Sequence, residues 1–123
     1  MSAAQVHYFL QLRNQVKLYH WQTRSYARHK ATDDAVDQLD EHIDKYVEVY
    51  AGKYGRPRLT GEAASFKLTN MTEAGAVRCI QAALKYLAGP LTRTLKATDS
   101  DLASIRDDMI ADLNQLLYLF SLH

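Results

Sequence analysis

Apolar side chains recur at steps of three and four residues in four stretches of the chain, the spacing that places them on one face of an α-helix. The first stretch covers residues 3–26 and contains neither proline nor glycine. The second covers residues 31–50, with Thr32 as its expected N-cap and with Asp33 and Asp34 favouring the positive end of the helix dipole. It is expected to end in residues 51–57, where two glycines and a proline stop a helix.

A connector and two further helices are predicted for the second half of the chain. Residues 56–70 form the connector, with a short helical turn expected at residues 61–65. The third helix is expected over residues 72–88, capped by Thr72 and broken or kinked by the pair Gly89 and Pro90. The fourth is expected from Ser100, which can act as its cap, to the C-terminus.

The lengths of the predicted connections indicate how these helices pair. The short loop expected at residues 28–31 makes the first two helices antiparallel neighbours, and the third and fourth are also closely linked. The longer connector lets the chain cross the end or side of a bundle. We therefore predict a single all-α domain over residues 1–123: a four-helix bundle of two antiparallel hairpins joined by a crossover, as in ferritin-like folds.

Composition narrows the class of protein further. The 123 residues suit one domain, and 47% apolar and 24% charged residues are typical of a soluble one. A formal net charge of +1, without a basic tail, argues against nucleic acid or an anionic membrane as a partner. The single cysteine, Cys79, excludes an internal disulfide and a multi-cysteine zinc site. Because no apolar run is as long as a signal peptide core or a membrane span, we expect a cytoplasmic protein.

A histidine and a stripe of acids are the residues most suited to chemistry. Acids follow one another at steps of four, three, four and four along the second predicted helix: Asp33, Asp37, Asp40, Asp44 and Glu48. His20 lies in the apolar phase of the first helix, and the predicted loop places it level with residues 40–44. His29 lies one helical turn before Asp33. Imidazole nitrogen and carboxylate oxygen together suit iron, manganese or zinc, so these residues are candidate metal ligands.

A structural interpretation of the same residues stays open. A stripe of acids is also what a solvated helix face carries. His20 can be a histidine at the edge of the core that is hydrogen-bonded to an aspartate, and His29 can be a surface loop residue. In that case the protein is a helical structural or interaction module without a working metal site.

Two segments carry a resemblance to known families. Residues 18–21 read Leu-Tyr-His-Trp, and they are followed by His29, Asp33, Asp44 and Glu48. This pattern resembles the first helical hairpin of Dps-type mini-ferritins. Residues 20–29 and 50–56 are more closely similar to a group of small ferritin-like proteins of phages and large DNA viruses. Both resemblances imply a ferritin-like fold.

The mini-ferritin resemblance also implies a site, a cofactor and an activity. It implies that His20, His29 and Asp33 form one half of a metal site, and that Asp44 and Glu48 form the other half, contributed by another subunit across a two-fold axis. The implied cofactor is iron, as a di-iron pair, with manganese or zinc as alternatives. The implied activity is ferroxidase, the oxidation of Fe(II) by oxygen or peroxide. The implied partner is another copy of the chain, in a homo-oligomer.

Departures from the family patterns limit where such a site can lie. The linker between His20 and His29 is shorter than in mini-ferritins and lacks their glycine. The crossover after Pro57 is short for their extra interface helix, which argues against a hollow shell and iron storage. The third and fourth predicted helices lack the Glu-x-x-His of larger ferritins. Any site is therefore expected on the first two helices, within one subunit or across a dimer.

Overall fold

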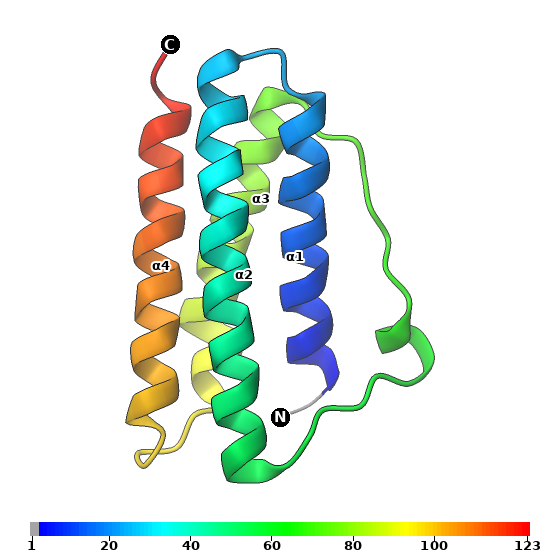
Figure 1. The fold of residues 1–123 in the computed structure, drawn as a ribbon, viewed down its shortest axis with the longest axis vertical. Coiled ribbons are helices and arrows are strands. Elements are labelled where there is room, and N and C mark those ends of the chain that lie inside the picture. Colours follow the sequence, from blue (N-terminus) through cyan, green and yellow to red (C-terminus); the bar gives the residue numbers. More distant parts are fainter. Residues whose placement is uncertain (1–2) are drawn as a thin grey trace.

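Four helices lie side by side in the computed structural model, which describes residues 3–123 (Figure 1). They are α1 (Ala3–Gln22), α2 (Tyr26–Tyr54), α3 (Glu73–Tyr86) and α4 (Ser100–Phe120). A 3-10 helix, η1 (Gly61–Ala64), lies between α2 and α3, and a π-helix, η2 (Leu87–Leu91), continues α3. The described residues contain no strand. The prediction of an all-helical bundle is confirmed.

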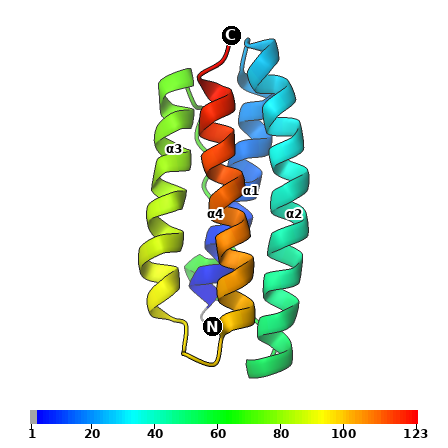
Figure 2. The ribbon, with the colours of Figure 1, turned by 90° about the vertical axis from the view of Figure 1, so that its left-hand side faces the viewer.

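The connections set the direction of each helix (Figures 1 and 2). The chain ascends in α1, descends in α2, returns along the outside of the bundle beside α1, descends in α3 and ascends in α4. Helix α2 packs against both α1 and α4, and α3 packs against α4 and α1. Among the helices of residues 3–123, none combines the length and hydrophobicity that crossing a bilayer requires.

The core is built from the apolar stripes of the four helices. In α4 the buried positions recur at steps of three and four: Leu102, Ile105, Met109, Leu113, Leu116 and Phe120. They pack against the corresponding stripe of α2, which includes Val36, Leu39 and Ile43. Each fully buried side chain of this size contributes about 1.5–3 kcal/mol through its removal from water.

The turn between α1 and α2 differs from the prediction. It occupies residues 23–25, and residues 28–31, expected to be the loop, lie inside α2. Ser25 is the N-cap, and its hydroxyl oxygen accepts the Arg28 N–H at 3.2 Å. Thr32, the expected cap, is fully buried inside the helix. The prediction was wrong because residues 26–30 contain no helix breaker, so the helix extends back to the first residue that can cap it.

The other boundaries follow the prediction more closely. Thr72 caps α3, since its hydroxyl oxygen accepts the Gly75 N–H at 3.0 Å. The kink expected at Gly89 and Pro90 is the π-helix η2, which accommodates the missing proline N–H. Ser100 is not the cap of α4: Asp99 occupies that position, and its carboxylate bonds to residues outside α4.

An extended segment of the crossover, residues 65–71, lies along α1, and we call it the strap. Side chains from one face of α1 bond to its backbone: His7 to Ser65, Gln11 to Lys67, Gln15 to Thr69, and Gln22 to Met71. The first three contacts advance by four residues on the helix and by two on the strap. These steps match, because four helical residues rise about 6 Å and two extended residues about 6.6 Å. Side chains of α1 thereby supply the hydrogen bonds that a neighbouring strand would otherwise give to the strap backbone.

Candidate functional site

Two histidines meet where α1 turns into α2. His20 lies in the last turn of α1 and His29 in the first turn of α2. Their rings stack, with centroids 3.9 Å apart and planes inclined by 15°. His20 is 6% exposed and His29 is half-buried. The exposed Asp33 places its Oδ1 atom 3.9 Å from His20 Nε2. The structure thus brings together three of the five residues predicted as metal ligands.

The hydroxyl of Thr32 determines which ring nitrogen of His20 carries the proton. The Thr32 Oγ1 atom lies 2.7 Å from the Arg28 carbonyl oxygen and 3.1 Å from that of His29, so its own proton points to a carbonyl. His20 Nδ1 lies 3.0 Å from the same hydroxyl oxygen. Because the hydroxyl proton is already used, His20 Nδ1–H must donate and Thr32 must accept. In the neutral ring, the lone pair of His20 is therefore on Nε2.

The same argument holds for His29. Its Nδ1 atom lies 2.9 Å from the backbone carbonyl oxygen of His20, which can only accept. Nδ1 therefore carries the proton, and the lone pair of the neutral ring is on Nε2. A metal-binding histidine typically donates its other ring N–H to a carbonyl or similar acceptor, which fixes the tautomer and the ring orientation. Both histidines meet this condition.

Asp44 and Glu48 lie elsewhere on α2. Both are exposed and lie one helical turn apart. Asp44 follows Asp33 by eleven residues, a rise of about 16 Å along the helix axis. The expectation that His20 lies level with residues 40–44 is therefore wrong for a single chain. Because the turn comes earlier than predicted, Asp40 lies level with Arg13, whose Nε is 2.8 Å from Asp40 Oδ1.

One chain by itself does not assemble a complete site. Within residues 3–123, no group of three His, Cys, Asp or Glu residues lies close enough to hold a metal ion. We call His20, His29 and Asp33 the half-site, and Asp44 and Glu48 the acidic pair. Asp33 of the half-site and the acidic pair lie on one exposed stripe of α2, together with Asp37 and Asp40.

Arg28 clamps the end of the bundle that carries the half-site. Its guanidinium donates to the Tyr19 hydroxyl at 2.9 Å, the Glu73 carbonyl at 2.8 Å and the Phe120 carbonyl at 3.2 Å, and thus ties together all four helices. It also forms an ion pair with the Glu73 carboxylate at 3.1 Å. The sequence prediction missed this role because it placed Arg28 in a loop.

Glu73 is held ionised by the same cluster. Burial by itself favours the neutral acid, but hydrogen bonds from Tyr19 and Thr23, together with the charge of Arg28, hold the pKa of Glu73 below its ordinary value. The ion pair of Arg28 and Glu73 therefore holds Tyr19 and Thr23, which precede and follow His20 in the sequence.

Two further histidines make contacts outside the predicted ligand set. His42 lies between α2 and α4, with Nε2 2.8 Å from an Asp112 carboxylate oxygen. His7 stacks on Phe66 of the strap, with centroids 4.9 Å apart. Neither contact could be found from periodicity, because each joins residues more than fifty positions apart in the chain.

Fold and site together define a four-helix protein with a stacked histidine pair at one end of its first hairpin. The chain belongs to a family of unknown function, DUF5856, whose model matches residues 20–120. The matched region contains the half-site and the acidic pair. No curated protein and no solved structure matches the chain.

Proposed function

We propose that the protein is a ferritin-like metal-binding protein whose site is completed across a dimer. The course of the chain supports the ferritin-like assignment. Helices α2 and α3 run in the same direction and are joined by one long crossover, as in ferritin-like bundles. The resemblance of residues 18–48 to the mini-ferritin hairpin points to the same class.

One observation carries the metal-binding proposal: both half-site histidines have Nδ1–H committed to a fixed acceptor. This leaves two Nε2 lone pairs, of which that of His20 lies 3.9 Å from the Asp33 carboxylate, and imidazole nitrogen with carboxylate oxygen suits iron, manganese or zinc. A metal ion lies close to the plane of the imidazole that binds it. Because stacked rings do not share a plane, His20 and His29 would hold two ions, one per ring.

Iron is the metal that we propose. Bound iron can pass an electron from Fe(II) to oxygen or peroxide, and the protein would then act as a ferroxidase. The residues of the chain would hold the ion and orient it: His20 and His29 as terminal ligands, and the carboxylates as terminal or bridging ligands.

A two-fold axis crossing the middle of α2 completes the site. His29 and Asp33 of the half-site precede Gln38 on α2, and the acidic pair follows Gln38 at a similar distance. Asp33 and the acidic pair share one exposed stripe. When two copies of α2 pack antiparallel along this stripe, the half-site of each copy faces the acidic pair of the other. Such an isologous contact repeats every interaction twice, so one dimer holds two equivalent sites.

The test is metal binding by the intact chain and by variants of each part. Fe(II) is added under argon, the protein is dialysed, and bound iron is measured by metal analysis. The wild type is expected to retain iron and to sediment as a dimer. His29→Gln and the double variant Asp44→Asn, Glu48→Gln are each expected to lose retained iron, since each removes ligands from both sites. His123→Gln and Asp108→Asn are matched controls at exposed positions and should bind as the wild type does.

Mixing the two defective variants distinguishes a shared site from two separate ones. In a mixed dimer, the intact half-site of one chain meets the intact acidic pair of the other. Random mixing makes about half of the dimers mixed, each with one of two sites, so about a quarter of the wild-type capacity should return. When Fe(II) is added in air, the mixed sample should also form Fe(III), followed by its absorbance, at about a quarter of the wild-type amount.

Two results would overturn the proposal. If the wild type retains neither iron nor zinc, the histidine pair is a structural element and the protein is a helical interaction module. If iron is bound but mixing restores nothing, the site is not shared between subunits.

A further inference from the structure

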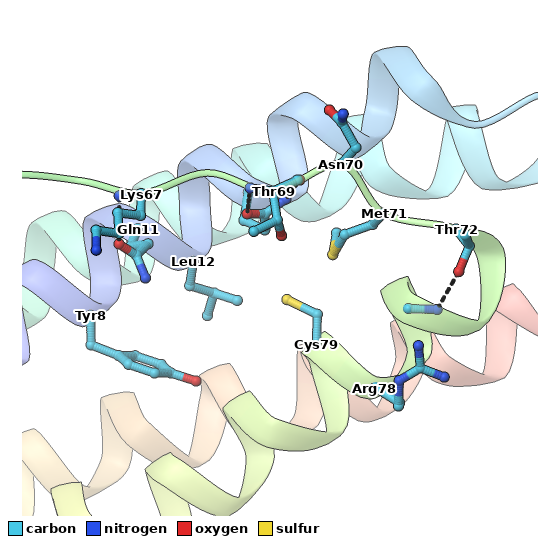
Figure 3. Close-up of a pocket in the computed structure, with 12 residues that line it drawn as sticks. Tyr8, Gln11, Leu12, Lys67, Thr69, Asn70, Met71, Thr72, Arg78 and Cys79 are labelled. Atoms are coloured by element: carbon cyan, nitrogen blue, oxygen red, sulfur yellow. Dashed lines mark hydrogen bonds between the residues drawn. The ribbon is translucent and has the colours of Figure 1, made fainter.

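A pocket of about 570 Å³ opens between α1, the strap and α3, and no residue of α2 lines it (Figure 3). Leu12, Met71 and Cys79 point into it from these three elements, and Tyr8 closes one end. This volume falls in the range of sites for small molecules. The pocket makes no use of the half-site or the acidic pair, so its role is independent of the metal-binding proposal.

The strap gives the pocket a fixed wall. Gln15 is buried, and its side chain donates to the Thr69 carbonyl at 2.6 Å and accepts the Thr69 N–H at 3.0 Å. Gln11 accepts the Lys67 N–H at 3.2 Å. These bonds hold the strap backbone at a set distance from α1 along the length of the pocket. A wall held in this way is preformed, which lowers the entropic cost of binding a ligand.

The floor of the pocket is uncharged at neutral pH. Burial raises the pKa of the Cys79 thiol, so the thiol keeps its proton. Burial, with smaller contributions from Cys79 and Tyr86, raises the pKa of Tyr8 to about 12. The floor thus offers apolar and weakly polar surface to a ligand.

The only charged side chains that line the pocket are cations. Lys67 projects from the strap and Arg78 from α3. No carboxylate lines the pocket, and neither cation forms an ion pair within residues 3–123. Figure 3 places these cations at opposite ends of the apolar floor. An apolar floor with an unpaired cation at its end is complementary to a molecule with an apolar body and an anionic head.

We propose that this pocket binds a small amphipathic carboxylate, with its apolar chain on Leu12, Met71 and Cys79 and its head on Arg78. The Arg78 guanidinium can hold a carboxylate through two parallel hydrogen bonds. Lys67, at the other end of the pocket in Figure 3, adds to its positive charge. A neutral molecule of the same length lacks these contacts and binds more weakly. An amine of the same length meets two like charges and is rejected.

Cys79 reports on occupancy of the pocket, because it is the single cysteine of the chain. Its alkylation by iodoacetamide, an uncharged reagent, is followed by mass spectrometry at mildly alkaline pH with increasing sodium octanoate. Octanoate is expected to slow the reaction in a saturable way. Octanol and octylamine at the same concentrations are expected to protect at least tenfold less well.

Charge variants test the role of the cations. In Lys67→Gln with Arg78→Gln, the octanoate concentration for half-protection should rise about tenfold, the effect of losing one charged hydrogen bond. Both side chains are exposed, so the fold should be unaffected, which circular dichroism checks. The matched control is Lys85→Gln with Arg93→Gln, two exposed cations outside the pocket, and it should behave as the wild type.

Three outcomes would overturn the proposal. They are an alkylation rate that octanoate leaves unchanged, protection by octanol equal to that by octanoate, and a test variant that matches its control. If Cys79 does not react at all, amide chemical shifts of Thr69 and Gly75 replace it as the readout: shifts on adding octanoate support the site, and unchanged shifts reject it.

Discussion

The buried side chain of Thr32 determines the tautomer of His20. It is fully buried, and its hydroxyl joins the backbone of α2 to the ring of His20 on α1. The hydroxyl proton is used by a carbonyl, so the oxygen is left as an acceptor for the His20 ring. The tautomer of His20 therefore depends on a residue outside the predicted ligand set.

Replacing Thr32 separates its two roles. Thr32→Val keeps the shape of the side chain and removes the acceptor, which leaves His20 Nδ1–H unpaired in the core. We expect a loss of about 1–3 kcal/mol in the free energy of unfolding, measured by urea titration. If the half-site binds metal, affinity should also fall by about 10–100-fold. Thr32→Ser keeps the hydroxyl and should retain most of the metal affinity; an equal loss in Ser and Val variants would contradict the role assigned to the hydroxyl.

Asp99 is a second residue whose contacts reach across the fold. Its carboxylate accepts from Lys53 at 2.8 Å, from the Tyr54 hydroxyl at 2.5 Å and from the Lys96 backbone N–H at 2.9 Å. These three donors, Lys53 foremost, hold the pKa of Asp99 well below its ordinary value. The carboxylate thereby ties the C-terminal end of α2 to the connection between α3 and α4.

The lowered pKa predicts how stability depends on pH. The contribution of Asp99 is fully present above the ordinary aspartate pKa of 3.8 and is lost as pH falls below it towards the lower folded-state value. Urea unfolding between pH 7 and pH 2 should therefore show a steeper loss in the wild type than in Asp99→Asn. Asp108→Asn, at an exposed position on α4, is the control and should retain the wild-type profile. Parallel profiles for wild type and Asp99→Asn would contradict this assignment.

Helix α2 is the element that joins the two halves of the bundle. It packs against α1 and α4, and it carries His29, Asp33 and the acidic pair. Ser25 caps its N-terminus and Gly55 caps its C-terminus, and the Gly55 φ of 106° lies in a region that residues with side chains rarely adopt. Gly52 and Gly55, the two glycines near this end, should therefore respond to alanine substitution with opposite changes in stability.

Alanine substitutions distinguish these glycines. Gly52 lies inside α2 with open space around it, so Gly52→Ala should raise the free energy of unfolding by about 0.5–1 kcal/mol through lower backbone entropy of the unfolded chain. Gly55→Ala should lower it by about 1–3 kcal/mol, because alanine is strained at that φ. Thermal and urea unfolding measure both. Equal effects of the same sign would show that α2 does not end as described.

At the scale of the whole molecule, the strap fastens the crossover to the bundle. The crossover joins α2 to α3 across the full length of the molecule, and only its last part is held by regular contacts with α1 (Figure 1). The glutamines of α1 are spaced to meet alternate strap residues, so the strap can be held without a sheet.

Gln15 is the centre of this attachment. Gln15→Met keeps the length of the side chain but leaves both polar groups of Thr69 without their protein partner. We expect a loss of about 1 kcal/mol in stability and faster amide hydrogen exchange at Thr69. Gln11→Met, which removes a single bond to Lys67, is the milder comparison. Unchanged exchange at Thr69 in Gln15→Met would show that the strap is held by other contacts.

Periodicity determined the helical class, the approximate extent of the helices and the kink at Gly89 and Pro90. These features depend on the spacing of apolar side chains and on proline and glycine, which act locally. Thr72 was found for the same reason, since a cap bonds to a residue three positions away. The turn between α1 and α2 was misplaced because Ser25 and Thr32 are both acceptable caps, and the local pattern does not rank them.

The tertiary structure decided which side chains from different elements come into contact. The position of the turn places His20 beside Asp33 and not level with Asp44, so the five predicted ligands do not meet within one chain. The stacking of His20 on His29, the acceptor role of Thr32, the clamp of Arg28 and the pocket beneath the strap all join residues from different elements. A sequence states which donors and acceptors a chain has. Which of them pair is decided by packing, because every buried polar group must find its partner among the neighbours that the fold provides.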